Sequence, residues 1–244
     1  MHWSHSFYER QDALTGCYRT PIHPFHTALA ARVTAHRGQP GTLLDLGAGG
    51  GQFAVAAALA GHRVTALDLR QGAGEHTLEL AAQHSTPVHT LTGDFYVADP
   101  GGPFDAVCCW DGFGIGEDDE QRHLISRVAG WLAVDGTAYV DVFTPWYWAH
   151  HAGFTRRTER YSQTYGFNAD GCRMLDTYAP RGEAALTQSL RCYSPADLRL
   201  LLAGTGLMLA EVWPGGAYDP RAGVFHAEVS LGESMMYTAV LRPA

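Results

Sequence analysis

The chain has 244 residues, of which 46% are hydrophobic and 17% charged, a composition typical of one globular domain with a hydrophobic core. Its 17 basic residues are all arginine, which excludes chemistry that needs lysine, such as a Walker A loop or a Schiff base. The formal net charge of -8, without a basic run, disfavours a nucleic-acid partner.

The cysteines predict a reduced, cytoplasmic protein. They are odd in number and form no C-x-x-C pair: Cys17, Cys108, Cys109, Cys172 and Cys192. No apolar stretch approaches the roughly 20 residues that span a bilayer, and the polar, aromatic start does not resemble a signal peptide, so we expect no membrane association. His23 and His26 lack partners at zinc-ligand spacing, so we expect no metal site.

In the first 144 residues, short apolar runs alternate with helical patterns, which is typical of a parallel α/β sheet. A helix over Pro24 to Arg37 precedes the sheet. The predicted strands are Thr42 to Leu46, Arg63 to Leu67, Val88 to Leu91, Phe104 to Trp110 and Thr137 to Phe143. The helices between them are Gln52 to Ala60, roughly Glu75 to His84, and Glu120 to Leu132.

The alternation stops after the fifth strand. Residues 145–193 are rich in aromatic residues, and Arg157 to Phe167, Cys172 to Tyr178 and Ala185 to Tyr193 have the pattern of antiparallel strands. Ser194-Pro195 then opens a helix over Ala196 to Ala203, followed by strands Leu207 to Trp213 and Met235 to Leu241. The chain therefore divides into residues 1–40 with N-terminal lid helices, a cofactor-binding core (41–144), a substrate cap insertion (145–193), and a last helix with two strands (194–244).

The sharpest local signal is LLDLGAGGG, in which Asp45 ends a strand and Gly47, Gly49 and Gly51 precede a helix. Glycines allow a ligand to approach the backbone, and the helix start offers N–H groups to it. A dinucleotide fingerprint would need its third glycine at the position of Gln52. An NAD-dependent oxidoreductase is therefore a less favoured alternative.

Asp45 with G-x-G-x-G resembles motif I of the class I S-adenosylmethionine-dependent methyltransferases. Further matches follow in register: Asp68 closes the second strand, Asp94 lies in GDFY, and FDAVCCW and LAVDGTAYVDVF are similar to the family's fourth and fifth strands. Val134 stands where the family's turn has proline. The resemblance implies a Rossmann-like, seven-stranded, mostly parallel sheet with helices on both faces, N-terminal lid helices and an insertion after the fifth strand.

The resemblance also implies S-adenosylmethionine as cofactor and S-adenosylhomocysteine as product. Asp68 is then expected on the ribose hydroxyls and Asp94 on the adenine amine, with Phe95 packed on the ring. The full set of expected cofactor contacts is Asp45, Gly47, Ala48, Gly49, Gly51, Asp68, Leu69, Asp94, Phe95, Trp110 and Tyr18.

A small-molecule acceptor is expected because the stretch from Trp110 to Phe113 lacks the proline pair of adenine and glutamine methyltransferases. The segment SFYERQDALTGCY resembles a lid helix, and the insertion opens on dense aromatic residues that suit an aromatic or heteroaromatic acceptor of natural-product metabolism. The expected acceptor contacts are Tyr8, Phe113, Trp146 and Tyr147.

A general base is needed only if the acceptor must lose a proton, and the candidates are His151, His150 and Asp111. His151 is slightly favoured because it lies four residues after Tyr147 and would share its face if this stretch were a helix. Three alternatives stay open: methyl transfer by positioning alone, use of the bound cofactor for other chemistry, and a silent binding module. Either a monomer or a homodimer is compatible with the sequence.

Overall fold

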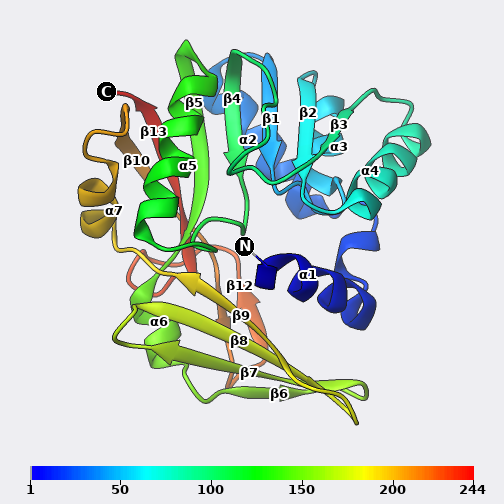
Figure 1. The fold of residues 1–244 in the computed structure, drawn as a ribbon, viewed down its shortest axis with the longest axis vertical. Coiled ribbons are helices and arrows are strands. Elements are labelled where there is room, and N and C mark those ends of the chain that lie inside the picture. Colours follow the sequence, from blue (N-terminus) through cyan, green and yellow to red (C-terminus); the bar gives the residue numbers. More distant parts are fainter. Residues whose placement is uncertain (1) are drawn as a thin grey trace.

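A computed structural model describes residues 2–244 and shows a seven-stranded central sheet in the order β10-β13-β5-β4-β1-β2-β3 (Figure 1). Its strands are β1 (Thr42–Leu46), β2 (Arg63–Asp68), β3 (His89–Thr92), β4 (Phe104–Cys109), β5 (Leu132–Phe143), β10 (Leu207–Pro214) and β13 (Met236–Pro243). Neighbours pair in parallel except β13, which is antiparallel to both β5 and β10. This confirms the predicted Rossmann-like sheet.

Helices cover both faces of this sheet. The helices α2 (Pro24–Arg37), α3 (Gln52–Leu59) and α4 (Gln71–Gln83) share one hydrophobic cluster with Leu43 of β1, while α5 (Asp118–Trp131) and α7 (Pro195–Leu202) share the other with Leu44. Adjacent strand residues point to opposite faces, so a strand buried on both sides is apolar throughout. The sheet core therefore holds the carboxyl ends of β1, β2 and β4 on one rigid edge.

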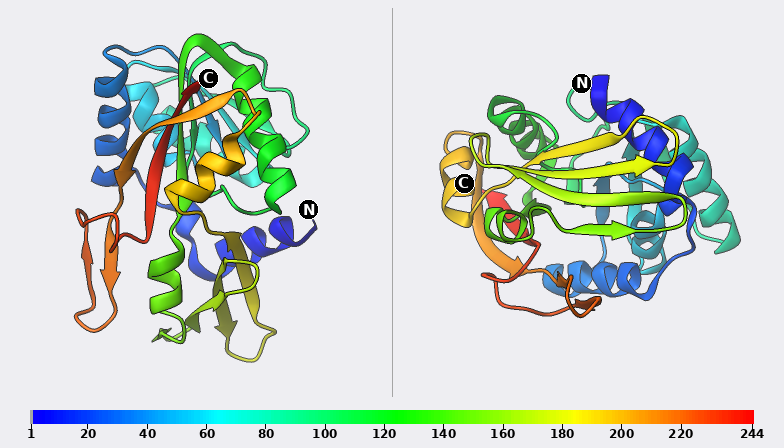
Figure 2. Two further views of the ribbon diagram at one scale, coloured as in Figure 1. Left: turned by 90° about the vertical axis from the view of Figure 1, so that its left-hand side faces the viewer. Right: turned by 90° about the horizontal axis from the view of Figure 1, so that it is seen from below.

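A second, four-stranded antiparallel sheet lies below that edge, and we call it the cap sheet. It follows α6 (Pro145–His150) and is formed by β6 (Thr155–Arg157), β7 (Tyr161–Asn168), β8 (Arg173–Pro180) and β9 (Leu186–Arg191), in that order. Helix α1 (His2–Thr15), with the short 3-10 helix η1 (Cys17–Arg19), lies between the two sheets (Figure 1). The hairpin of β11 (Ala217–Asp219) and β12 (Val224–His226) extends from the body (Figure 2, orange).

Two predicted strands differ from the structure, and two elements were not predicted. The expected strand Arg157 to Phe167 is two strands, β6 and β7, because residues 158–160 form a turn in which Thr158 Oγ1 accepts a hydrogen bond from the N–H of Tyr161. Helix α6 was not expected; Pro145 occupies its first turn, where no backbone N–H is needed. The β11–β12 hairpin also was not predicted, and β5 begins at Leu132 rather than Thr137.

Candidate cofactor site

The loop between β1 and α3 has a backbone that side chains would obstruct. Gly49 and Gly51 have φ of 56° and 79°, in the left-handed region. A Cβ on Gly49 would lie 3.0 Å from the Tyr18 ring, and one on Gly51 would lie 2.2 Å from Thr77 Oγ1. The loop is thus packed against η1 on one side and α4 on the other, which explains the spacing of its glycines.

Asp68, the last residue of β2, lies across from this loop. Its carboxylate accepts hydrogen bonds from the N–H groups of Gly49 (2.8 Å) and Arg70 (2.9 Å). Burial raises the pKa of Asp68, although these bonds and the Arg70 guanidinium oppose the rise. Arg70 also lies over the Tyr18 ring, 4.3 Å from its centroid. A carboxylate has about four lone-pair sites, so Asp68 retains acceptor capacity for ligand hydroxyls.

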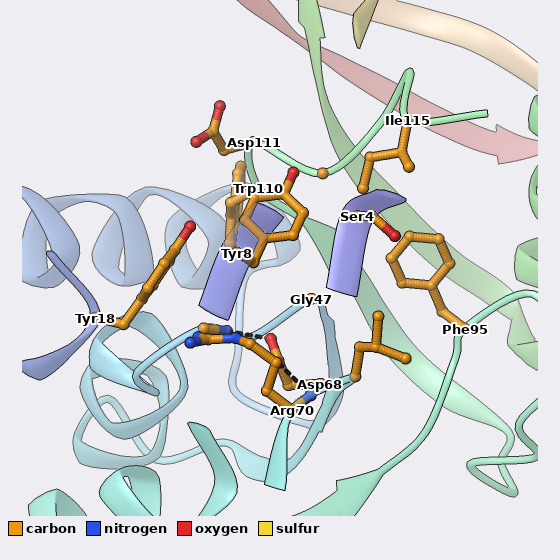
Figure 3. Close-up of a pocket in the computed structure, with 13 residues that line it drawn as sticks. Ser4, Tyr8, Tyr18, Gly47, Asp68, Arg70, Phe95, Trp110, Asp111 and Ile115 are labelled. Carbon is orange, nitrogen blue, oxygen red and sulfur yellow. Dashed lines mark hydrogen bonds and ion pairs between the residues drawn. The ribbon is translucent and has the colours of Figure 1, made fainter. Parts of the chain in front are cut away.

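A cavity of about 660 Å³, open solvent at its mouth included, lies over these residues (Figure 3). The part of it that admits a water-sized sphere is about 100 Å³, smaller than most small-molecule sites, which are about 300–1,000 Å³. It is lined by Ser4, Tyr8, Tyr18, Gly47, Gly49, Asp68, Leu69, Arg70, Phe95, Trp110, Asp111, Gly112 and Ile115. Polar groups that can hydrogen-bond a ligand therefore share the cavity with flat aromatic surfaces.

Most of the predicted cofactor contacts meet in this cavity: Gly47, Gly49, Asp68, Leu69, Phe95, Trp110 and Tyr18. Ala48 and Gly51 belong to the same loop without lining it. Asp94 is also absent from the lining, and its Oδ1 accepts the N–H of Tyr96 at 2.9 Å. The sequence prediction missed Ser4, Arg70, Gly112 and Ile115. Of these four, only Arg70 could have been found from a local sequence pattern, because it lies two residues after Asp68.

Asp45 lies under the loop at the end of β1, with 1% of its surface exposed. Neither of its carboxyl oxygens has a hydrogen-bond partner. Burial, and secondarily the nearby Asp68, raise the pKa of Asp45 to about 8. A buried carboxyl without partners is unfavourable, and an ammonium group brought by a ligand would supply what it lacks. Asp45 itself does not line the cavity.

Asp111 follows β4 with φ of 59°, an unusual backbone conformation for a residue other than glycine. Its carboxyl lies at the opposite end of the cavity from Asp68 (Figure 3). Its side chain is accessible from the cavity. Desolvation of the carboxyl by the surrounding protein raises the pKa of Asp111 to about 7, and the charges of Asp141 and Asp176 add to the rise. A carboxyl with this pKa can accept or release a proton near neutrality.

The other predicted acceptor contacts and both histidines do not line the cavity. Phe113 is fully buried in the core, its ring 5.8 Å from that of Tyr193, so its expected contact with an acceptor is corrected. Tyr147 donates from its hydroxyl to the carbonyl of Tyr218, and Trp146 packs in the same hydrophobic cluster. His150 is exposed at the end of α6.

His151 does share the face of Tyr147, as its spacing predicted. The two rings stack with centroids 4.1 Å apart, and His151 Nδ1 lies 2.8 Å from the Tyr147 carbonyl oxygen. These contacts hold the imidazole within the cap, outside the cavity lining. Of the three candidate bases, the structure brings only Asp111 to the cavity.

Polar side chains connect the roof of the cavity to the cap sheet. The Tyr8 hydroxyl accepts from Gln188 Nε2 at 2.9 Å, and the Tyr18 hydroxyl donates to Gln11 Oε1 at 2.8 Å. Gln11 donates in turn to the Tyr178 hydroxyl at 3.2 Å. The lid helix and the cap sheet therefore form one continuous cover. This network could not be predicted from local patterns, because its members come from α1, η1, β8 and β9.

Within residues 2–244, no group of three or more histidine, cysteine or carboxylate side chains is arranged to hold a metal ion. No helix in the same range is long and apolar enough to cross a membrane. All five cysteines are free thiols.

Residues 43–136 match a family described as "Methyltransferase domain". No curated protein matches the chain by sequence. Among solved structures, the chain is similar to the CcbJ methyltransferase from Streptomyces caelestis (21% identity, TM-score 0.71, covering 92% of this chain and 90% of that one). An S-adenosylmethionine-dependent methyltransferase from Clostridium acetobutylicum ATCC 824 is similar over 98% of both chains (15% identity, TM-score 0.73).

The sugar N-methyltransferase KedS8 from Streptoalloteichus sp. ATCC 53650 is also similar, at 20% identity and a TM-score of 0.60, over 90% of this chain and 87% of that one. These likenesses extend beyond the matched domain to the lid and cap segments of this chain. Residues 43–136 are therefore a methyltransferase domain, and the chain as a whole has the fold of these methyltransferase structures.

Proposed function

We propose that this enzyme methylates a small aromatic or heteroaromatic acceptor of natural-product metabolism, in the cavity between the glycine loop and the lid helix. The observation that carries the proposal is the cavity lining, which combines Asp68 and Asp111 with the rings of Tyr8, Tyr18, Phe95 and Trp110. Flat apolar walls with a few placed polar groups suit a planar organic ligand. KedS8, similar in fold, is named a sugar N-methyltransferase, which supports a small acceptor.

The cofactor contacts follow from the polar groups at one end of this cavity. Asp68 is proposed to accept the ribose hydroxyls, and Asp45 to pair with the ammonium of the methionine part, because its oxygens have no protein partner. Asp94 is proposed for the adenine amine, beside the Phe95 ring. When bound, S-adenosylmethionine supplies an electrophilic methyl group on a positively charged sulfur.

The protein contributes mainly by positioning and by excluding water. Tyr8 and Tyr18 come from the lid, and Trp110 packs edge-on against Phe53 of α3, 4.9 Å between centroids. Such fixed rings hold an acceptor in one orientation, and orientation can supply a large part of a displacement reaction's acceleration. The closed cover also keeps water from competing for the methyl group.

Asp111 is proposed to receive the acceptor's proton where one must leave. It lines the cavity and its pKa of about 7 suits proton transfer near neutrality. His151 and His150 remain candidates from the sequence, but neither lines the cavity. A proton-accepting role for either would require a movement of α6.

Intact-mass analysis of an acceptor panel tests this proposal. Purified protein is incubated with S-adenosylmethionine and phenols, amines or indoles, and each product is examined for the gain of one methyl group. We expect methyl gain on at least one planar acceptor, with S-adenosylhomocysteine formed in equal amount. Cofactor binding without methyl gain on any acceptor would favour the use of the cofactor for other chemistry.

The expectations of a cytoplasmic protein, of a monomer or homodimer, and of no nucleic-acid or membrane partner stay predictions.

A further inference from the structure

The inner face of the cap sheet, which faces the central sheet, carries a row of polar residues: Gln163 of β7, Asp176 of β8 and Gln188 of β9. Along β8, Met174 packs with Phe143 of the central sheet, and Tyr178 lies 6.2 Å from Phe7 of α1. Residues two apart on a strand share a face, so Asp176, between them, points the same way. Asp176 therefore faces the space between the core, the lid helix and the cap.

Asp176 has neighbours from both adjacent strands. It lies opposite Tyr165 of β7 and Gln188 of β9 in the sheet register. Gln188 donates to the hydroxyl of Tyr8, which lines the cofactor cavity. Gln188 is thus one hydrogen bond from the cavity, and Tyr178 is connected to it through Gln11 and Tyr18.

One oxygen of Asp176 lacks a partner. Its Oδ2 accepts from Gln163 Nε2 at 2.7 Å, and a hydrogen bond from the Tyr178 hydroxyl also lowers the pKa of the carboxyl. The Oδ1 atom is buried with no partner at hydrogen-bond distance, and only 6% of the residue is exposed. A buried acceptor without a donor is unfavourable by about 1–3 kcal/mol. Such groups are rare in native proteins, and a donor supplied by a ligand is one way to satisfy them.

Asp111 and Asp176 lie within electrostatic range of each other. They are close enough for the charge of Asp176 to raise the pKa of Asp111, and neither forms an ion pair within residues 2–244. Arg156 affects Asp176 only from a distance, because its guanidinium donates to Gln163 Oε1 at 2.7 Å. Asp111 thus lines the cavity, while Asp176 is buried outside its lining with no cationic partner in direct contact.

We propose that the acceptor carries a basic amine, that Asp111 and Asp176 bind it as an ammonium group, and that its nitrogen is the methylated atom. The inference rests on the proposed methyl transfer and narrows the acceptor to amines. An ammonium group has several N–H donors, which can satisfy the free Asp176 Oδ1 and the Asp111 carboxylate together.

The reaction balances in protons and electrons. The bound ammonium loses one proton to the Asp111 carboxylate, which frees the nitrogen lone pair. That lone pair forms the new carbon–nitrogen bond as the carbon–sulfur bond breaks, and the bonding pair stays on sulfur. The positive charge thereby moves to the methylated nitrogen, beside the Asp176 carboxylate. The Asp111 proton then passes to solvent when the product leaves.

Matched probe pairs that differ only in the amine test the inference on protein loaded with S-adenosylhomocysteine. Suitable pairs are tyramine with 4-ethylphenol and glucosamine with glucose, with binding measured by ligand-observed NMR. We expect at least one amine to bind about 10-fold or more tightly than its neutral partner, as one charged hydrogen bond contributes about 1.5–3 kcal/mol. Asp176→Asn should remove most of that preference.

Two variants accompany Asp176→Asn. Asp111→Asn should also reduce the preference, which keeps the test informative if Asp176→Asn misfolds. Asp170→Asn, an exposed carboxyl in the β7–β8 turn of the same sheet, should leave it unchanged. Melting temperature and S-adenosylhomocysteine affinity are measured for each, so loss of structure is recognised.

Equal binding within every pair, no binding of any amine, or a preference that survives both carboxyl substitutions would overturn the inference. Methylation of a phenol or carbon in preference to an amine would do the same while leaving the proposed function intact. Failure to bind S-adenosylhomocysteine would instead contradict the proposed function itself.

Discussion

Gln188 in the cap sheet donates a hydrogen bond to the Tyr8 hydroxyl in the lid helix, 2.9 Å away and 180 residues apart in sequence. Tyr8 lines the cofactor cavity, so this bond joins two separate parts of the chain above the reacting groups. Burial raises the pKa of Tyr8, which keeps its hydroxyl neutral at physiological pH. The bond therefore restrains α1 against the cap sheet beside the cavity.

Tyr8→Phe should loosen the lid. The substitution removes one hydrogen bond, worth about 1 kcal/mol, and leaves Gln188 Nε2 without its acceptor. We expect amide hydrogen exchange in α1 to become several-fold faster, and acceptor KM to rise more than cofactor Kd. Ser6→Ala, an exposed change on the same helix, should leave both unchanged. Unaltered exchange in Tyr8→Phe would show that the bond does not restrain the lid.

Arg173→Lys should destabilise the junction between cap and core. The Arg173 guanidinium donates to the carbonyl oxygens of Gly114, Ile115 and Gly116 and to Ser189, and only 9% of the residue is exposed. Lysine cannot reproduce this planar set of donors. With two charged hydrogen bonds lost, we expect a decrease of about 3 kcal/mol in the free energy of unfolding.

Urea denaturation measures this change. Arg157→Lys on the exposed strand β6 serves as the control and should unfold at the wild-type midpoint. Because Ile115 lines the cavity, Arg173→Lys should also weaken cofactor binding. A midpoint equal to that of the control would contradict the assigned role of Arg173.

Asp45 should make cofactor binding depend on pH. Its pKa is about 8 in the folded protein and about 3.9 in an unfolded chain, so folding takes up a proton between these values. The contribution of Asp45 to stability therefore falls as pH rises from about 4 to about 8. A bound ammonium favours the ionised form, so cofactor affinity should rise over pH 6–8 and then level off.

Calorimetry at pH 7 in buffers of different ionisation enthalpy measures the linked proton. We expect up to one proton to be released per S-adenosylhomocysteine bound by the wild type, and about one fewer by Asp45→Asn. Asp68 is the neighbouring acid that affects Asp45 most, and it is unchanged in this comparison. Equal proton release in both proteins would remove Asp45 from the ammonium site.

The three candidate bases can be separated by single-turnover methyl transfer across pH. Asp111→Asn should slow the step by about 10²-fold or more, because general-base contributions are typically 10²–10⁴-fold. His150→Ala and His151→Ala should keep near-normal rates, since neither side chain lines the cavity. If only His151→Ala slowed methyl transfer, His151 would be the general base, as its spacing to Tyr147 suggested.

The sequence predicted the central sheet well because the strands that follow the glycine loop have distinct local patterns. Asp45, Gly49 and Asp68 each end or follow a parallel strand, and the carboxyl ends of such strands meet at one edge. Their approach was therefore predictable from strand order alone. The position of Trp110 and Asp111 after β4 followed from the same rule.

The acceptor side was less predictable because it depends on packing between distant segments. Asp176 looks like any polar residue in a strand of alternating pattern, and only the register with Gln188 and the position of Tyr8 reveal its surroundings. The His151–Tyr147 spacing was read correctly as a shared helix face. The direction of that face toward or away from the cavity depends on α6, whose orientation no local pattern specifies.

The most direct test of the account is titration of the purified protein with S-adenosylhomocysteine, in parallel with NAD, by calorimetry. The account predicts saturable binding of S-adenosylhomocysteine and none of NAD. Asp68→Asn should weaken binding about 10-fold or more, because contacts of the Asp68 carboxylate with the ribose hydroxyls are lost. Glu79→Gln, an exposed change on α4, should bind as the wild type does. Tight binding of NAD with none of S-adenosylhomocysteine, or an unaffected Asp68→Asn, would contradict the assignment of this cavity.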